Sequence, residues 1–205
     1  VREQYDDVAV VCYVNSTAEI KAVSDVCVTS SNAIKVVKNI KNKRIFFVPD
    51  NNLGRYVAKQ LPEKEFIFND GFCHVHKSID PKLVAEAKEH HPDALVLAHP
   101  ECTEDVLELA DYIGSTAGIL DYATESECKK FIICTEMGIF FKLSKQNPDK
   151  KFYSVGHRQF CPNMKKVSLE KVAAVMENPT EEVLLSDDIM NEACKPLQKM
   201  LELAK

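Results

Sequence analysis

The stretch "VVCYVNS" at residues 10–16 runs from apolar residues into polar ones, and "VLAHPEC" at residues 96–102 does the same. Placed one over the other at an offset of 86, the two stretches align Tyr13 with His99. A short apolar run of this kind is typical of a buried strand in a parallel sheet. The match raises the question of whether the whole chain is a repeat.

The 86-residue offset continues beyond these first stretches. Two more pairs of segments align at it: "SDVCVTSSNA" (24–33) with "ADYIGSTAGI" (110–119), and "RIFFVPDNNL" (44–53) with "KFIICTEMGI" (130–139). A two-residue insertion then shifts the offset to 88 and places Cys73 over Cys161. At the new offset, residues 80–98 align with residues 168–186. The sequence therefore contains two copies of one unit and the beginning of a third.

The repeat predicts how the chain is divided. We expect three parts: an α/β unit at residues 1–78, a second α/β unit at residues 79–165, and a C-terminal segment at residues 166–205. The third copy stops soon after its first strand and the helix that follows. Because the chain also starts inside a unit and without Met, we expect that a first domain is missing and that the C-terminal segment completes it.

Each unit has the pattern of an α/β fold. Residues 80–91 have helical periodicity with Pro81 in the first turn, and the apolar run at 94–98 is of the buried-strand type. A helix is expected at 103–110, where Thr103 precedes acidic residues. Strands that alternate with helices predict parallel sheets covered on both faces, that is, repeated three-layer α/β/α domains. Binding residues then belong at the carboxyl ends of the strands.

Composition and charge exclude several classes of protein. The 205 residues carry a net charge of -5, so no basic surface for nucleic acid is expected. The longest apolar runs, such as residues 94–98, are far too short to cross a membrane, and no secretory signal is visible. We therefore expect a cytoplasmic protein whose eight cysteines are reduced, so that metal binding or catalysis becomes the question for these thiols.

Hydroxyl groups stand at matched strand ends in both units. "TSSNA" at residues 29–33 contains Ser30, and "GSTAG" at residues 114–118 contains Thr116. Hydroxyls and backbone N–H groups at the start of a following helix form a good cradle for a carboxylate or a phosphate. The same residue types also cap helices, and the sequence supports the two interpretations about equally.

Cys73 and Cys161 are equivalent in the repeat, and a complete third unit would supply a third equivalent cysteine. Three thiolates from three related units suit a [4Fe–4S] cluster with one iron left open to bind substrate as a Lewis acid. The alternative is a non-catalytic, zinc-stabilised binding module, because residues 73–76 and 99–102 have zinc-like Cys-x-x-His and His-x-x-Cys spacing. The repeat argues against zinc, since only the Cys73 position keeps a ligand in both copies. Whether Cys73 and Cys161 form a disulfide without a cluster is left open.

Several long motifs resemble those of one known family. They are, in order, "YVNSTAEIKAVSDVCVTSSNA", "PDNNLGRYVA", "GFCHVH", "HPECTEDVLELADYIGSTAGI", "TEMGI" and "CPNMKKVSLE". Over nearly the whole chain they resemble quinolinate synthase, the A protein of NAD biosynthesis. The resemblance implies an enzyme that condenses iminosuccinate with dihydroxyacetone phosphate to quinolinate. It also implies three similar α/β/α domains around a pseudo-threefold axis, with an oxygen-sensitive [4Fe–4S] cluster held by three cysteines, one per domain.

The resemblance also assigns roles to residues. Cys73 and Cys161 match two cluster ligands, the third ligand belongs to a domain outside this chain, and Cys102 matches no ligand. The implied substrate site consists of Tyr13, Val14, Asn15, Ser30, His99, Pro100, Glu101 and Thr116. The candidates for proton transfer among them are Tyr13, His99 and Glu101. The implied partners are the two small-molecule substrates and L-aspartate oxidase upstream, and the chain by itself is expected to be inactive.

Overall fold

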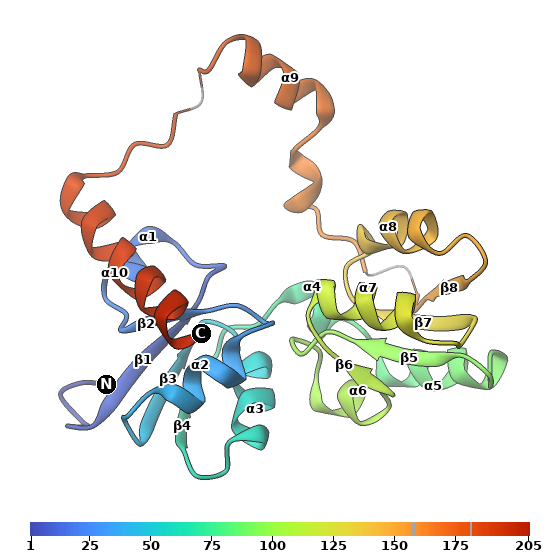
Figure 1. Cartoon of the computed structure of the whole chain (residues 1–205), viewed down its shortest axis with the longest axis horizontal. Helices are drawn as coiled ribbons and strands as arrows, with labels where there is room; N and C mark the ends of the chain where they lie inside the picture. Colours follow the sequence, from blue (N-terminus) through green and yellow to red (C-terminus); the bar gives the residue numbers. More distant parts are fainter. Residues whose placement is uncertain (157–158, 181) are drawn as a thin grey trace.

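The computed structural model describes residues 1–156, 159–180 and 182–205. It contains two α/β units, each built on a four-stranded parallel sheet (Figure 1). The predicted α/β class with repeated parallel sheets is therefore confirmed. The pseudo-threefold arrangement and the additional domain remain predictions.

The first unit, coloured blue to teal in Figure 1, has the strand order β2-β1-β3-β4. Its strands are β1 (Val8–Tyr13), β2 (Val26–Val28), β3 (Arg44–Val48) and β4 (Glu65–Phe68). Its helices are α1 (Ala18–Ala22), α2 (Ala33–Asn39), α3 (Asn51–Gln60) and α4 (His74–Lys77). Val11 of β1 and Phe47 of β3 are fully buried, as expected for central strands whose two faces are both covered.

The second unit, coloured green to yellow, has the matching strand order β6-β5-β7-β8. Its strands are β5 (Leu95–Ala98), β6 (Tyr112–Ile113), β7 (Lys130–Cys134) and β8 (Lys151–Ser154). Its helices are α5 (Pro81–His90), α6 (Glu104–Glu108), α7 (Thr116–Glu125) and α8 (Ile139–Gln146). Leu97 of β5 and Ile133 of β7 are fully buried, which reproduces the pattern of the first unit.

The two sheets are paired in the same register. Val10 lies opposite Phe46 in the first sheet, and Val96 lies opposite Ile132 in the second, so both partners are displaced by the same 86 residues. A shift of one residue in either sheet would turn every side chain of a strand to the other face. The common register therefore confirms the internal repeat predicted from the sequence.

One side-chain contact is repeated as well. The carboxylate of Asp25 accepts a hydrogen bond from the N–H of Val10 at 2.7 Å, and the carboxylate of Asp111 accepts one from the N–H of Val96 at 2.8 Å. Each aspartate stands just before the edge strand of its sheet and binds an N–H of the neighbouring strand where that edge strand does not reach. The repeat therefore includes side chains as well as the backbone, because the matched aspartates make the same hydrogen bond in both units.

Polar residues begin several helices at the carboxyl ends of the strands. Asp50 caps α3 and Ser115 caps α7, each by accepting a hydrogen bond from a backbone N–H, at 2.8 Å and 3.1 Å. Thr103 precedes α6 as predicted, but its side chain makes no capping hydrogen bond. The helix starts and the strand ends together place polar groups along one edge of each sheet.

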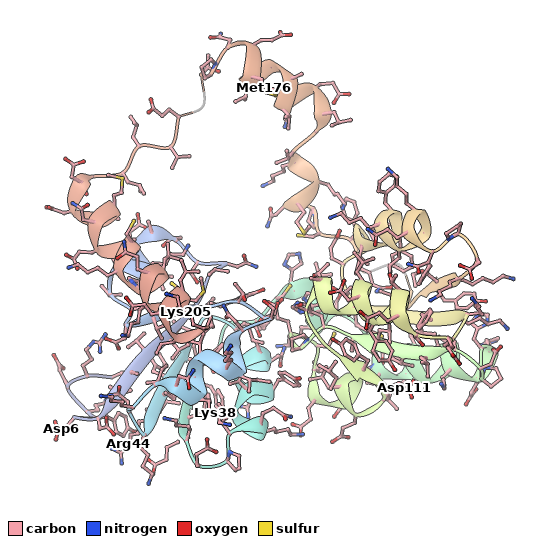
Figure 2. All side chains as sticks on the ribbon, viewed as in Figure 1. Asp6, Lys38, Arg44, Asp111, Met176 and Lys205 are labelled. Carbon is pink, nitrogen blue, oxygen red and sulfur yellow. The ribbon has the colours of Figure 1, made fainter. Side chains whose placement is uncertain are left out.

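The chain after the second unit contains the short helix η1 (Met164–Lys166) and the helices α9 (Leu169–Glu177) and α10 (Asp187–Leu203). No residue of α9 is buried, and Figure 2 shows Met176 on this helix, far from both sheets. α10 returns to the first unit and packs against α1, β2 and α2 (Figure 1). Among the described residues, no helix is both long and apolar enough to cross a membrane.

The predicted first strand of the third copy is not formed. Residues 183–186 are not in a strand, and the side chains of Val183 and Leu184 are 84% and 79% exposed. A strand needs neighbours that pair with its N–H and C=O groups, and no strand in the described ranges pairs with this segment. The prediction of a strand here is therefore wrong for this structure, while the assignment of residues 166–205 to a further domain stays a prediction.

Candidate active site

The segments that follow β3, β5 and β7 meet between the two units. The side chain of Asn52 donates a hydrogen bond to the backbone oxygen of Glu101 at 3.1 Å, and His76 is hydrogen-bonded to Thr135 at 2.9 Å. Both contacts join a residue of the first unit to one of the second. The polar groups at the strand ends of the two sheets therefore form one joint site.

Tyr13 ends β1 and points into this junction. Ser30, Glu101, Asp50 and Cys73 are all close enough to the Tyr13 hydroxyl to influence its pKa. Burial, with a smaller contribution from the Glu101 carboxylate, raises the pKa of Tyr13 well above its usual range. Tyr13 is therefore a neutral hydroxyl at pH 7 and can donate a hydrogen bond to a substrate oxygen.

Two histidines and a glutamate form a buried cluster. The rings of His76 and His99 are stacked, with centroids 4.6 Å apart and an angle of 17° between the planes. The Oε2 atom of Glu101 lies 3.2 Å from Nδ1 of His99 and 3.5 Å from Nδ1 of His76. The cluster thus places two imidazoles and one carboxylate within proton-transfer distance of one another.

Burial sets the protonation states of this cluster. It lowers the pKa of His76 and of His99 to about 4, and it raises the pKa of Glu101. Both imidazoles are therefore neutral at pH 7, and the glutamate holds a proton more readily than an exposed one does. A neutral imidazole can accept a proton and a carboxyl group with a raised pKa can donate one, so the cluster contains both kinds of group that general acid–base catalysis uses.

The Cys73 loop (residues 69–76) is held by Asp50. One carboxylate oxygen of Asp50 accepts a hydrogen bond from the N–H of Leu53 at 2.8 Å, and the other accepts one from the N–H of Cys73 at 2.7 Å. Asp50 is only 3% exposed, and burial raises its pKa to about 6. The carboxylate therefore fixes the start of α3 and the backbone of Cys73 at the same time.

The Cys161 loop (residues 159–164) is held in the same way by Glu136. This carboxylate accepts hydrogen bonds from the N–H of Gly138 at 2.6 Å and from the N–H of Cys161 at 3.3 Å, and it pairs with Lys165 at 3.0 Å. Burial acts to raise the pKa of Glu136, but these three contacts outweigh it and lower the pKa. Asp50 and Glu136 are also matched in the repeat, so each unit braces its cysteine with an equivalent carboxylate.

The remaining predicted substrate residues lie outside the buried cluster. Val14 packs against the hydrophobic core of the first unit. Asn15 and Thr116 are exposed at the ends of their strand and loop. The structure therefore places these three side chains at the border of the site, and their contacts with substrate stay predictions.

A cavity of about 370 Å³ opens beside the cluster, between the two units. Ser30 and Pro100, both predicted site residues, line it together with Ser115 and Tyr112. Ser115 uses its hydroxyl to cap α7, whereas Ser30 caps no helix. The hydroxyls at the two matched strand ends therefore have different roles. The Ser115 hydroxyl caps a helix, whereas the Ser30 side chain lines the cavity and caps no helix.

The zinc arrangement drawn from sequence spacing is not formed as a set of four ligands. Cys102 is fully buried, and its Sγ donates a hydrogen bond to the backbone oxygen of Cys134 at 3.3 Å. Within the described residues, the one group able to hold a metal consists of Cys73, His76 and Glu101. Cys102 is not a member of this group, and its assignment as a non-ligand by the family resemblance stays a prediction.

Sequence reasoning missed several residues of this site. His76 was set aside because its partner in the repeat is Met164, yet the structure buries it against His99 and Glu101. Asp50 and Glu136 align at the 86-residue offset, each at the second position after a matched strand, and this alignment is the signal that could have identified them. Thr135, which contacts His76, carried no signal in the sequence.

Comparison with known proteins gives one consistent result. A family model described as "Quinolinate synthetase A protein" matches residues 1–202. Quinolinate synthase of Caldicellulosiruptor saccharolyticus is 51% identical over 204 residues, which are 100% of this chain and 67% of that protein. Quinolinate synthases of Clostridioides difficile and Fusobacterium nucleatum are 48% and 50% identical and also align with 100% of this chain, which spans 67% and 68% of their lengths.

Proposed function

The chain belongs to the quinolinate synthetase A family of enzymes, and we propose that it carries the part of a quinolinate synthase that condenses iminosuccinate with dihydroxyacetone phosphate to quinolinate. The observation that supports this most is the buried cluster at the junction of the two units. Tyr13, His99 and Glu101, three of the proposed catalytic residues, lie together there beside Cys73. Such a reaction needs several proton transfers between oxygen, nitrogen and carbon, and the cluster offers the groups for them.

Each side chain of the cluster suits a different proton task. Glu101 has a raised pKa and can protonate a leaving hydroxyl or take a proton from carbon. His99 is neutral at pH 7 and can accept a proton, which Glu101 at 3.2 Å helps to hold. Tyr13 is a neutral donor for a carbonyl or carboxylate oxygen. This division of roles is part of the proposal.

The cavity between the units is the proposed place of the substrate acid groups. Ser30 supplies a hydroxyl to it, and the amino end of α7 faces it through Ser115 and Gly118. The start of a helix and a hydroxyl that caps no helix favour anions such as a carboxylate or a phosphate. Asn15 and Thr116 stand at the border of the site and are proposed to reach the substrate from there.

Cys73 and Cys161 are proposed to hold a [4Fe–4S] cluster together with a third ligand. The two residues fit this role: both are unpaired thiols, half-buried, and their backbone is fixed by Asp50 and Glu136. Burial raises the pKa of the Cys73 thiol, and the N–H groups of His76 and Val75, which face its sulfur, offset only part of that rise. When bound, a cluster with one open iron supplies a Lewis acid for a substrate oxygen.

The proposal also covers the place of the reaction in the cell and the enzyme that supplies one of its substrates. Iminosuccinate is the oxidised form of aspartate, so L-aspartate oxidase is proposed as the upstream partner, and the cytoplasm as the place of the reaction. Both proposals come from the family resemblance and from the chemistry of the substrate.

The direct test is quinolinate formation by the full-length protein, produced without oxygen and supplied with the two substrates. Glu101→Gln keeps the size of the side chain and removes its acid–base function, so kcat should fall at least about 100-fold. Glu104→Gln is a matched control, because Glu104 lies three residues away and pairs with Lys59 on the surface. No quinolinate from the unmodified protein, or equal activity in Glu101→Gln, would contradict the proposal.

A further inference from the structure

Three metal-binding groups of different chemistry meet at the start of α4. The ligand atoms of Cys73, His76 and Glu101 all lie within 4.8 Å of one another. His76 and Glu101 are buried and Cys73 is half-buried, so an ion among them would be largely shielded from water. In residues 1–156, 159–180 and 182–205, no second group of this kind is found.

His76 has a ring nitrogen without a partner. Its side chain is 8% exposed, and its Nδ1 makes no hydrogen bond. Its Nε2 lies 2.9 Å from the hydroxyl of Thr135. When Nε2 carries the proton and donates to Thr135, Nδ1 presents a lone pair toward Glu101. A buried polar atom left unpaired destabilises the folded state, and a bound cation would satisfy it.

This use of the two ring nitrogens is typical of a metal-bound histidine. One nitrogen faces the ion, and the other is fixed by a hydrogen bond to a neighbouring side chain. Here Thr135 is the side chain that fixes the second nitrogen. It belongs to the second unit, and its hydrogen bond holds the ring of His76 across the junction. The imidazole is therefore oriented before any ion arrives.

The distances suit a tetrahedral ion. Zinc binds nitrogen and oxygen at about 2.0–2.2 Å and sulfur at about 2.3 Å, which separates tetrahedral ligand atoms by about 3.3–3.8 Å. The Nδ1 of His76 and the Oε2 of Glu101 are already 3.5 Å apart. The three ligand atoms lie within 4.8 Å of one another, and Asp50 keeps the backbone of Cys73 in place beside the other two.

Charge and donor type favour the same ion. One thiolate and one carboxylate balance a divalent cation, and a neutral imidazole adds no charge. Cys73 gives up its thiol proton to solvent when the ion binds. A set of one sulfur, one nitrogen and one oxygen selects zinc or cobalt over magnesium and calcium, which prefer oxygen ligands alone.

We propose that the chain binds a single zinc ion at Cys73, His76 and Glu101 when no iron–sulfur cluster is present, with water as the fourth ligand. This site goes beyond the proposed function and does not depend on it. Because Cys73 is also a proposed cluster ligand, zinc and the cluster exclude each other at this residue. Zinc bound here blocks Glu101 as well, so the zinc form is inactive.

The test is a titration of the reduced, metal-free chain of 205 residues with cobalt(II), in the absence of oxygen, iron and sulfide. Tetrahedral cobalt bound to a thiolate absorbs visible light, so the spectrum reports the geometry and the sulfur ligand together. We expect one cobalt per chain, displaced by one zinc. His76→Ala and Cys73→Ser should weaken binding at least about 100-fold, and Thr135→Val about tenfold, as for other outer partners of metal ligands.

Matched controls separate this site from the other thiols. Cys161→Ser and Cys102→Ser should keep both the spectrum and the affinity. Thr135→Val removes only the partner of Nε2, so it gives an independent result should His76→Ala fail to fold. Absence of cobalt binding at micromolar concentrations, binding unchanged in both His76→Ala and Thr135→Val, or binding lost in Cys161→Ser would overturn the proposal. Since the assay contains no cluster and no substrate, its failure is distinguishable from a failure of the proposed function.

Discussion

The two cysteine loops have the same backbone support and different surroundings. Asp50 and Glu136, at matched positions, each accept a hydrogen bond from the N–H of their cysteine. Around Cys73 the structure places the buried side chains of His76 and Glu101, whereas the residue matched with His76 in the Cys161 loop, Met164, is 59% exposed. The Cys73 loop lies between the units. The Cys161 loop leads into the part of the chain that contains η1 and α9.

This difference shows which parts of the site the repeated unit supplies and which parts require contact between the two units. The repeated unit supplies strand register, a carboxylate and a cysteine to each loop. The acid–base cluster arises once, because it needs residues of both units in contact. The chemistry of the site therefore belongs to the junction, and the support of the cysteines belongs to each unit separately.

The largest expected effect concerns α10, which packs on α1, β2 and α2 of the first unit. Deletion of residues 187–205 removes Met200, Leu197 and Leu203, which pack on the core of the first unit, and exposes the apolar side chains that they cover. Burial of three such side chains contributes about 4–6 kcal/mol, so the first unit should lose most of its stability. Hydrogen exchange measured by mass spectrometry should show faster exchange in β1 and β2 and unchanged exchange in β5 and β7.

The control for this deletion is Leu201→Ser, because Leu201 lies on the outer face of α10 and is 63% exposed. It should change exchange in neither unit. Equal loss of protection in both sheets after the deletion would show that the units are not stabilised independently.

A smaller effect is expected when the two carboxylate braces are removed in turn. Asp50→Ala removes the cap of α3 and leaves two buried N–H groups unpaired, and should reduce the free energy of unfolding by about 3 kcal/mol. Glu136→Ala should cost about 1 kcal/mol, because Glu136 caps no helix and its bond to Cys161 is longer, at 3.3 Å. Urea unfolding with unchanged slope measures both values.

Asp80→Ala serves as a reference for the loss of a cap alone. Asp80 caps α5 through one exposed hydrogen bond of 2.9 Å, so its removal should cost no more than about 1 kcal/mol. If Asp50→Ala were no more harmful than Asp80→Ala, the brace on Cys73 would contribute nothing to folding.

Much of the fold followed from the sequence because it depends on pattern. The 86-residue offset predicted two equivalent sheets, and the paired register bears this out at Val10 and Val96. The polar residues after the strands were expected at the carboxyl edge, and Tyr13 and Glu101 do meet there. Periodicity and strand ends are local properties, so one sequence is enough to show them.

The junction could not be predicted in the same way. The alignment of His76 with Met164 argued only against His76 as a metal ligand, because a repeat compares units and contains no information on how the units touch. The strand expected at residues 183–186 was drawn from the same comparison, but strand pairing depends on neighbours that a copy of the sequence does not supply. α10 likewise packs on the first unit through contacts distant in sequence.

The smallest expected effects on stability concern Ser115 and Ser30, the serines at the matched strand ends of the two units. Ser115→Ala should reduce stability by about 1 kcal/mol, since Ser115 caps α7. Ser30→Ala should change stability by less than about 0.5 kcal/mol, because Ser30 caps no helix, but it should lower kcat/KM. Thermal unfolding together with the quinolinate assay would decide between capping and binding at each position, and a large stability loss in Ser30→Ala would contradict the binding role.

The most direct test of the central claim is the iron and acid-labile sulfide content of the full-length protein purified without oxygen, compared among single cysteine variants. If the two braced loops present ligands to one cluster, the unmodified protein and Cys102→Ser should hold about four irons and four sulfides per chain. Cys73→Ser and Cys161→Ser should both lose the cluster, despite the different surroundings of the two loops. A cluster retained in either variant, or lost in Cys102→Ser, would contradict the account.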